Sequence, residues 1–305
     1  MNQARWIYVG GNIFECSKCK NPRVTMAPDS VKWCEKCGSS MLGPDIKCYF
    51  KFIIPTYDRQ SVEIAKSCIL TQTFKNVHVV VVHDGTAEDL SSLDYTVDNH
   101  LIDRYTDIYC EYRRYNGGTR NAGLDYSGIQ SKYTMFLDDD DFLSDSTILD
   151  HLYDFIQEAG EPDMIRLPYM RYYTDDKRTA IKSLNDNIDL PSTCRSGKTA
   201  PWTKCIKSEL VVPFPENTMF EDVVQHIHQC DKCETFAYFP EPVVVWNIHN
   251  KQASKGGNPK WESSKYRFIA DLMDLKLDHD WAIEMRDKKV EMAIEALCKD
   301  YLINQ

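Results

Sequence analysis

Apolar runs alternate with amphipathic segments through the middle of the chain. The runs at 49–54, 77–82 and 133–137 contain few polar residues, which is typical of strands covered on both faces of a parallel sheet. Segments 61–71 and 145–158 repeat their apolar residues at helical spacing. This alternation of β and α elements predicts an α/β domain with a doubly wound sheet flanked by helices.

The second half of the chain has a looser pattern. A helix is expected at 220–229, a loop at the polar stretch 185–191, and one or two amphipathic helices at 261–303. Further strands are predicted at 164–172, 236–239 and 243–246.

The amino-terminal segment contains two CxxC pairs, Cys16-Ser-Lys-Cys19 and Cys34-Glu-Lys-Cys37, separated by fourteen residues. Four thiolates on two turns are the ligand set of a tetrahedral structural Zn²⁺. The prolines and polar residues around them offer no core in which to bury cysteines. We therefore predict a zinc ribbon over 1–46, a large α/β domain over 47–258 and a helical segment over 259–305.

A second group with ligand chemistry is His226, His228, Cys230 and Cys233. Two residues on a helix that are two positions apart point about 200° from one another, which opposes joint ligation by the histidines. A second zinc site here stays an alternative. The other six cysteines are expected to be small core residues: Cys48, Cys68, Cys110, Cys194, Cys205 and Cys298.

Charge is distributed unevenly along the chain. Its net charge of -10 argues against a protein that coats nucleic acid, but residues 1–51 hold eight Lys/Arg against four acids. Four zinc-bound thiolates would reduce that local excess and leave a modest basic patch. No apolar run approaches the length of a membrane span, and the first residues lack a secretory pattern, so we expect a cytoplasmic protein.

Polar residues lie beside each predicted strand, at the edge where open α/β sheets bind ligands. Four stations line up in chain order: Pro55-Thr56-Tyr57-Asp58-Arg59, His83-Asp84-Gly85-Thr86, Asn116 to Gly123 with Arg120 and Asn121, and Asp138-Asp139-Asp140-Asp141.

In their order and spacing these stations resemble the family 2 glycosyltransferases, with their P-x-Y, D-G-S/T, A-R-N-x-G and F-L-D-x-D-D motifs. The resemblance covers roughly residues 50–255. It continues in four downstream stations, which resemble the family's W-x-K, F-P, E-D and aromatic-x-x-H motifs: Ala200-Pro-Trp202-Thr-Lys204, Phe214-Pro215, Phe220-Glu221-Asp222-Val223 and Trp246-Asn-Ile-His249.

The resemblance implies a GT-A-like mixed sheet and a nucleotide-sugar donor, favoured as a UDP-sugar. Asp84 and Gly85 would hold the uracil, although His83 replaces the family's usual acid there, and an ordinary strand-ending turn is the alternative. Asp140, with His249 as a possible second ligand, would bind Mn²⁺ or Mg²⁺, the hard cations that carboxylates suit. The other donor-binding residues implied are Pro55, Tyr57, Asp138 and Asp139, with Arg120 and Asn121 at a helix start beside the diphosphate. A solvated turn at the aspartate run and a surface Arg120 are the alternatives.

For the acceptor side, the resemblance implies that Asp222, paired with Glu221, is the base that takes the acceptor proton in an inverting transfer. A helix N-cap is the alternative role of Asp222. Trp202 and Lys204 are expected to line the acceptor side, with a core tryptophan and a surface lysine as the alternative.

The predicted activity is hexosyl or pentosyl transfer, with two candidate acceptors. The basic ribbon favours a hydroxymethylated or already glycosylated base in phage DNA, in a host cytoplasm. The alternative is a soluble enzyme of surface polysaccharide or glycolipid synthesis, and a binding module without chemistry is a third hypothesis that the intact acidic stations oppose. The transferred sugar and the oligomeric state are not predicted.

Overall fold

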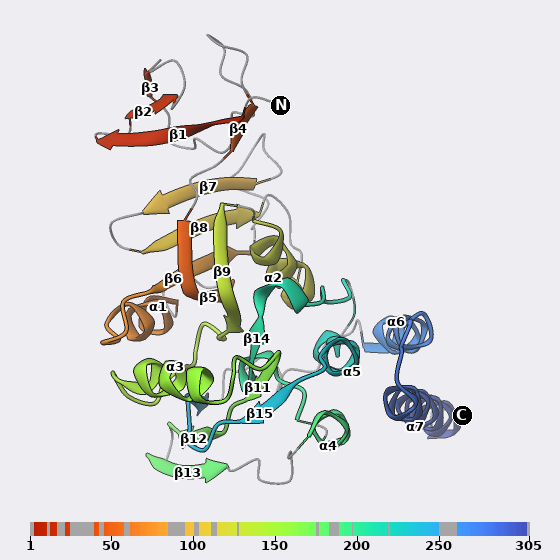
Figure 1. The fold of residues 1–305 in the computed structure, drawn as a ribbon. Coiled ribbons are helices and arrows are strands. Elements are labelled where there is room, and N and C mark those ends of the chain that lie inside the picture. The colour runs from red at the N-terminus through yellow and green to blue at the C-terminus, as the bar shows by residue number, and fades with distance from the viewer. Residues whose placement is uncertain are drawn as a thin grey trace.

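The computed structural model describes residues 3–10, 13–16, 22–24, 40–42, 46–57, 62–84, 95–100, 104–110, 115–126, 128–174, 177–182, 189–196, 198–216, 218, 220–249 and 261–303. A mixed eight-stranded sheet forms its centre (Figure 1). The strand order is β15 (Phe236–Tyr238), β11 (Met164–Arg166), β14 (Lys204–Lys207), β9 (Ile129–Phe136), β5 (Ile46–Thr56), β6 (Val77–His83), β8 (Tyr105–Cys110) and β7 (Tyr95–His100). Strands β9, β5, β6 and β8 are parallel, whereas β14 and β7 run antiparallel to their neighbours β9 and β8. The predicted α/β class with a mixed sheet is confirmed.

Helices cover both faces of this sheet. On one face α1 (Val62–Leu70) and α3 (Ile148–Glu158) pack against Phe52 and Ile54. On the other, α2 (Tyr115–Asp125) packs against Ile53. Successive residues of β5 are therefore buried on opposite faces, which explains why its sequence is an apolar run without polar alternation.

A second sheet has the order β10 (Phe142–Leu143), β16 (Val244–Ile248), β12 (Tyr169–Tyr173) and β13 (Arg178–Lys182). The single strand expected at 164–172 is wrong, because the chain leaves the main sheet after β11 and joins this second sheet at β12. Pro168 lies between them, and a proline without an N–H group cannot continue a central ladder.

Helices α4 (Leu190–Arg195), α5 (Glu221–Lys232), α6 (Trp261–Met273) and α7 (Asp280–Ile303) share a separate apolar cluster with β14 and β11. Two 3-10 helices, Pro201–Thr203 and Ser208–Leu210, flank β14. The loop expected at 185–191 is wrong at its end: Asp189 caps α4 by accepting a hydrogen bond from the Ser192 backbone at 2.7 Å. Pro191 fits the first turn of this helix, where its missing N–H has no intrahelical partner to lose.

Four strands are described near the amino terminus, in the order β3 (Pro22–Val24), β2 (Ile13–Cys16), β1 (Gln3–Gly10) and β4 (Ser40–Leu42). Cys16 ends β2, whereas Cys19, Cys34 and Cys37 lie outside the described residues, so the zinc ribbon stays a prediction. The division of the chain at 46 and 258 likewise stays a prediction.

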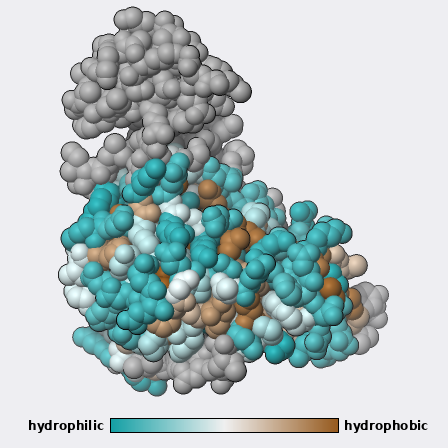
Figure 2. Space-filling model, in the orientation of Figure 1, coloured by the Kyte–Doolittle hydropathy of each residue, from teal (hydrophilic) through white to brown (hydrophobic). Residues whose placement is uncertain are grey.

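The described surface is mostly hydrophilic on the face in Figure 2, with apolar residues scattered over its centre and its right side. Within the described ranges, no helix has both the length and the apolar content needed to cross a bilayer. Of the cysteines expected in the core, Cys110, Cys194 and Cys205 are buried, and Cys48 and Cys68 are partly buried. Cys298 is exposed on α7, so that expectation is wrong for this residue.

Candidate active site

The carboxyl ends of β5, β6 and β9 meet at one edge of the main sheet. The Thr56 hydroxyl donates to Asp139 at 2.6 Å, and the Asp84 backbone N–H donates to the Thr56 carbonyl at 2.7 Å. Pro55 is partly buried near the end of β5, and Tyr57 just beyond this strand is 58% exposed. Three of the four predicted stations therefore converge at this edge.

Asp84 holds the start of α2. Its carboxylate accepts a hydrogen bond from the Tyr115 backbone at 3.1 Å. Its predicted neighbour Gly85 lies outside the described residues. The observed contact favours an anchoring role for Asp84, and a contact with a base stays a prediction.

His83 is held by strand β8, which was not predicted. The His83 Nε2 lies 2.9 Å from Asp107 Oδ1. The His83 ring stacks on the Tyr109 ring, with the two ring centroids 4.4 Å apart. The β-branched and aromatic residues of 105–110 are the signal that could have found this strand.

Arg120 is buried, with 4% of its surface exposed, and it bridges two acidic stations. Its guanidinium donates to Asp138 at 2.9 Å and to Glu221 at 3.1 Å. Burial lowers the pKa of Arg120, but the two carboxylates outweigh it and the net direction is upward. The alternative of a surface Arg120 is wrong.

The expected position of Arg120 and Asn121 at a helix start is also wrong, because α2 begins earlier, at Tyr115. Asn121 instead exchanges two hydrogen bonds of 2.8 Å with the backbone of Phe214. This amide therefore fixes the loop that leads toward α5.

Each carboxylate of the aspartate run has a different partner. Asp138 binds Arg120, Asp139 binds Thr56, and Asp140 lies 2.9 Å from His249 Nε2. Asp141 is 1% exposed and accepts the backbone N–H of Asn247 at 2.9 Å. The alternative of a solvated turn is wrong, because these contacts tie the run to β5, α2 and β16.

Burial raises the pKa of Asp140, and the nearby Asp138 raises it further. Burial also raises the pKa of Asp141 well above its ordinary value, again with a contribution from Asp138. A crowded, partly buried set of carboxyl groups is a favourable environment for a cation.

Asp140 and His249 stay the predicted ligands of a divalent metal, and their donor atoms suit such an ion. Their side chains are 29% and 24% exposed, so a cation and a substrate can reach them. No group of three or more His, Cys, Asp or Glu surrounds one point in the part of the chain that the structure describes. A Mg²⁺-type site with one or two protein ligands leaves the other positions to phosphate oxygens and water.

Glu221 and Asp222 form the first turn of α5. They follow Phe220, whose φ of 77° places a non-glycine residue in the left-handed region and turns the chain sharply into the helix. Phe220 occupies the N-cap position, so the alternative that Asp222 caps this helix is wrong.

Glu221 and Asp222 have different environments. Burial raises the pKa of Glu221, and its ion pair with Arg120 offsets part of that rise. Asp222 is half-buried and accepts the hydroxyl of Thr199 at 2.5 Å. The turn is close to α2: a Cβ added to Gly117 would lie 2.3 Å from the carbonyl oxygen of Pro215.

Trp202 and Lys204 are both buried. Trp202 packs edge-on against Tyr169, with ring centroids 4.9 Å apart. Lys204 is 0% exposed, and its ammonium donates to the Thr199 carbonyl at 2.8 Å. A lysine with no exposed surface cannot contact an acceptor from this position, which contradicts the expectation that it lines the acceptor side.

The alternative zinc site at 226–233 has no support in the geometry. His226 uses both ring nitrogens, one 3.0 Å from the Thr193 carbonyl and the other 3.2 Å from the Lys204 nitrogen. His226 is fully buried, whereas His228 is only partly buried. Burial lowers the pKa of His226, which is consistent with a neutral core histidine.

Residues 51–196 match the model of glycosyl transferase family 2. An uncharacterized glycosyltransferase, the MG025 homolog of Mycoplasma pneumoniae, is 23% identical over 246 residues, which cover 74% of this chain and 76% of that protein. The minor teichoic acid biosynthesis protein GgaB of Bacillus subtilis is 29% identical over 148 residues, covering 46% of this chain and 15% of GgaB.

A solved structure, TarS 1–349 from S. aureus in complex with UDP-GlcNAc, matches with a TM-score of 0.60. It is 15% identical and the match covers 78% of this chain and 70% of that one, so it supports the fold. The family model spans the four stations at the strand ends, and the Mycoplasma relative is itself named a glycosyltransferase. The protein is therefore a glycosyltransferase with a GT-A-like fold, and its residues 51–196 are similar to glycosyl transferase family 2.

Proposed function

We propose that the protein transfers a sugar from a UDP-sugar to an acceptor hydroxyl with inversion at the anomeric carbon. The observation that carries the proposal is the bridge made by Arg120. It joins Asp138, at the end of β9, to Glu221, at the start of α5. The aspartate run and the proposed base, Asp222, therefore belong to one connected site.

Donor binding is proposed at the strand-end edge. The aspartate run there resembles the family's diphosphate station, and the TarS structure with the similar fold contains UDP-GlcNAc. A Mn²⁺ or Mg²⁺ ion on Asp140 and His249 would neutralise the charge of the departing diphosphate. Tyr57, 58% exposed beside this edge, is proposed to contact the bound nucleotide.

Proton transfer is assigned to Asp222. Its carboxylate takes the proton of the acceptor hydroxyl while that oxygen forms a bond to the anomeric carbon. The bond from this carbon to the diphosphate oxygen breaks at the same time, and UDP leaves with the electron pair. Glu221 stays paired with Arg120 and holds the turn in place.

For the acceptor we now favour a saccharide or surface polymer over DNA. GgaB is a minor teichoic acid biosynthesis protein, and neither its name nor that of the Mycoplasma relative points to DNA. The DNA hypothesis depends on the basic residues of 1–51 and on a ribbon with Zn²⁺ on Cys16, Cys19, Cys34 and Cys37. Most of these residues lie outside the described ranges, so the DNA acceptor and the zinc ribbon are both tested by experiment.

The test compares Asp222→Asn with the wild type, using a panel of UDP-sugars and two acceptors. One acceptor is a free or lipid-linked saccharide, and the other is hydroxymethylated DNA. We expect loss of transfer to the saccharide, by at least about 100-fold, with donor binding retained. Asp154→Asn, the same change on the exposed surface of α3, is the matched control. Near wild-type turnover by Asp222→Asn would show that the base is assigned incorrectly, and labelling of DNA alone would restore the DNA acceptor.

A further inference from the structure

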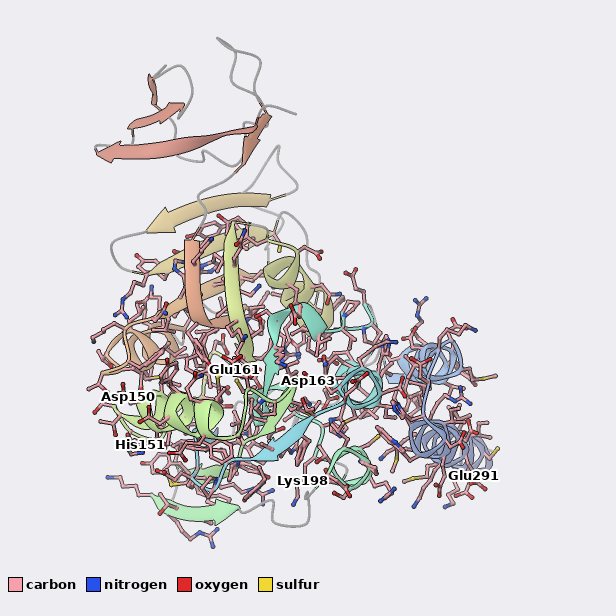
Figure 3. All side chains as sticks on the ribbon, in the orientation of Figure 1. Asp150, His151, Glu161, Asp163, Lys198 and Glu291 are labelled. Carbon is pink, nitrogen blue, oxygen red and sulfur yellow. The ribbon has the colours of Figure 1, made fainter. Side chains whose placement is uncertain are left out.

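Segment 198–204, which contains the 3-10 helix Pro201–Thr203 and the first residue of β14, contacts α5 through buried polar groups. Its first residue, Lys198, is labelled in Figure 3, and its carbonyl accepts a hydrogen bond from the buried guanidinium of Arg166. Arg166 also donates to the Thr203 hydroxyl at 2.7 Å. The segment is therefore fixed from the side of β11 as well as from α5.

The Lys204 ammonium is fully buried, yet each of its three N–H groups has an acceptor. These acceptors are the carbonyl of Thr199 at 2.8 Å, the carbonyl of Ala200 at 3.4 Å and His226 Nδ1 at 3.2 Å. Burying an ammonium is costly unless its hydrogen bonds are satisfied. Burial and the nearby Arg166 lower the pKa of Lys204 to about 7. Among the described residues no carboxylate contacts this ammonium directly, and we infer that so costly a buried lysine has a role beyond packing.

His226 fixes the direction of the Lys204 contact. Its Nε2 lies 3.0 Å from the Thr193 carbonyl, which can only accept, so Nε2 carries the proton. The neutral ring then presents the Nδ1 lone pair to Lys204. Because His226 follows Asp222 by four residues on α5, both side chains project from the same face of the helix.

Thr199 links this buried network to the proposed base. Its backbone carbonyl accepts from Lys204, and its hydroxyl donates to one oxygen of Asp222 at 2.5 Å. Thr199 is only 9% exposed, so solvent does not compete strongly for this contact. One carboxylate oxygen of Asp222 is thereby occupied, which restricts rotation of the group and leaves the second oxygen for an acceptor hydroxyl.

We propose that Thr199 and Lys204 are positioning residues that hold the carboxylate of Asp222 in the orientation needed to take the acceptor proton. This inference rests on the proposed function, in which Asp222 is the base. Lys204 acts through Thr199 and does not touch the substrate. The sequence predicts that Lys204 lines the acceptor side, whereas its proposed role is to support Asp222 through Thr199.

The experiment measures kcat and the donor KM for Thr199→Val, Thr199→Ser and Lys204→Met, with a UDP-sugar and acceptor that the wild type uses. Losing a hydrogen bond to a charged group, or misplacing a base, lowers rates by about 10-fold to 100-fold. We expect kcat to fall by that factor in Thr199→Val and Lys204→Met, with the donor KM changed by less than about twofold. Serine keeps the hydroxyl, so Thr199→Ser should recover most of the lost kcat.

The chain offers matched controls for both substitutions. Thr193 is buried, and its hydroxyl has no hydrogen-bond partner among the described residues, so Thr193→Val removes a buried hydroxyl but keeps the backbone carbonyl that His226 contacts. Lys51 is a second buried lysine, in β5, where burial also lowers its pKa. Lys51→Met should leave kcat near the wild-type value.

The outcomes separate this inference from the proposed function. Wild-type kcat in Thr199→Val, with Asp222→Asn inactive, would overturn the positioning role and leave the base intact. Full activity in Asp222→Asn would instead overturn the base itself. A loss in Thr199→Val that serine does not rescue, or that Thr193→Val reproduces, would show a packing role only and overturn the inference. If Lys204→Met fails to fold, the threonine series alone decides.

Discussion

Replacing Arg120 by methionine should destabilise the fold and give the loss a characteristic pH dependence. The change keeps much of the side-chain volume but removes the charge that links two carboxylates, at 2.9 Å from Asp138 and 3.1 Å from Glu221. Removing one partner of a buried ion pair costs about 3–5 kcal/mol, because the other charge stays buried without compensation. The Asp138 side chain is 35% exposed and can recover water, whereas Glu221 is 12% exposed and cannot. We therefore expect the lower end of this range, about 3 kcal/mol at pH 7.

The pH dependence follows from the raised pKa of Glu221. A carboxyl group whose folded pKa exceeds its unfolded value binds more protons in the folded state. Its contribution to stability therefore falls as pH rises from the unfolded value through the folded one. Without Arg120 the pKa of Glu221 rises further. The deficit of Arg120→Met should be complete at neutral pH and shrink as pH falls toward the unfolded value, 4.5.

Urea unfolding at pH 7 and pH 5 measures this deficit. Arg267→Met is the matched control, because Arg267 is 60% exposed and its pair with Asp271 on α6 is worth about 0.3–0.5 kcal/mol. The double variant Arg120→Met with Glu221→Gln should recover part of the loss. Equal stability of Arg120→Met and the wild type, or a deficit that does not change with pH, would refute this account of the bridge.

Three further predictions concern packing, pH and metal. Gly117→Ala should destabilise the fold by about 1–3 kcal/mol in urea unfolding, because the new methyl group would lie 2.3 Å from the Pro215 carbonyl; unchanged stability would contradict that close approach. Lys204 has a pKa of about 7 in the folded state, against an ordinary value of 10.5, so the unfolded state binds more protons between these two pH values. The free energy of unfolding of the wild type, relative to that of Lys204→Met, should therefore rise by about 2 kcal/mol from pH 7 to pH 9. A flat difference across that range would show that Lys204 is not a titrating buried amine. Protein purified without chelator should contain about one zinc per chain and lose it together with the amino-terminal fold on chelation, whereas freely titratable thiols and no zinc would exclude the four ligands Cys16, Cys19, Cys34 and Cys37.

The strands and the polar stations could be predicted because their signals are local. A strand buried on both faces must be apolar at successive positions, as in β5 and β6, and a ligand edge must be polar where the apolar run stops. The apolar end of β9 followed by the polar run Asp138–Asp141 matches this pattern. No contact between distant parts of the chain is needed to recognise this pattern.

The positions that could not be predicted depend on such contacts. From the sequence, Lys204 is expected at the acceptor side or on the surface. Its burial depends on contacts with the carbonyls of Thr199 and Ala200 and with the ring of His226. Strand β8 was missed because Thr106 and Asp107 interrupt its apolar residues, and Asp107 is a polar residue that the fold uses to hold His83. The left-handed Phe220 leaves no sequence signal, since glycine is the residue expected there.

The most direct test of the central claim is UDP release from a panel of UDP-sugars, measured with Mn²⁺ or Mg²⁺, with a chelator, and with Asp140→Asn. Metal-assisted neutralisation of a leaving group is worth several kcal/mol. We predict that at least one UDP-sugar is turned over only with the metal, and that Asp140→Asn lowers the rate at least about 100-fold at saturating metal. Metal-independent release that Asp140→Asn does not change, or no binding of any UDP-sugar by folded protein, would contradict a metal-dependent, UDP-sugar-using transferase.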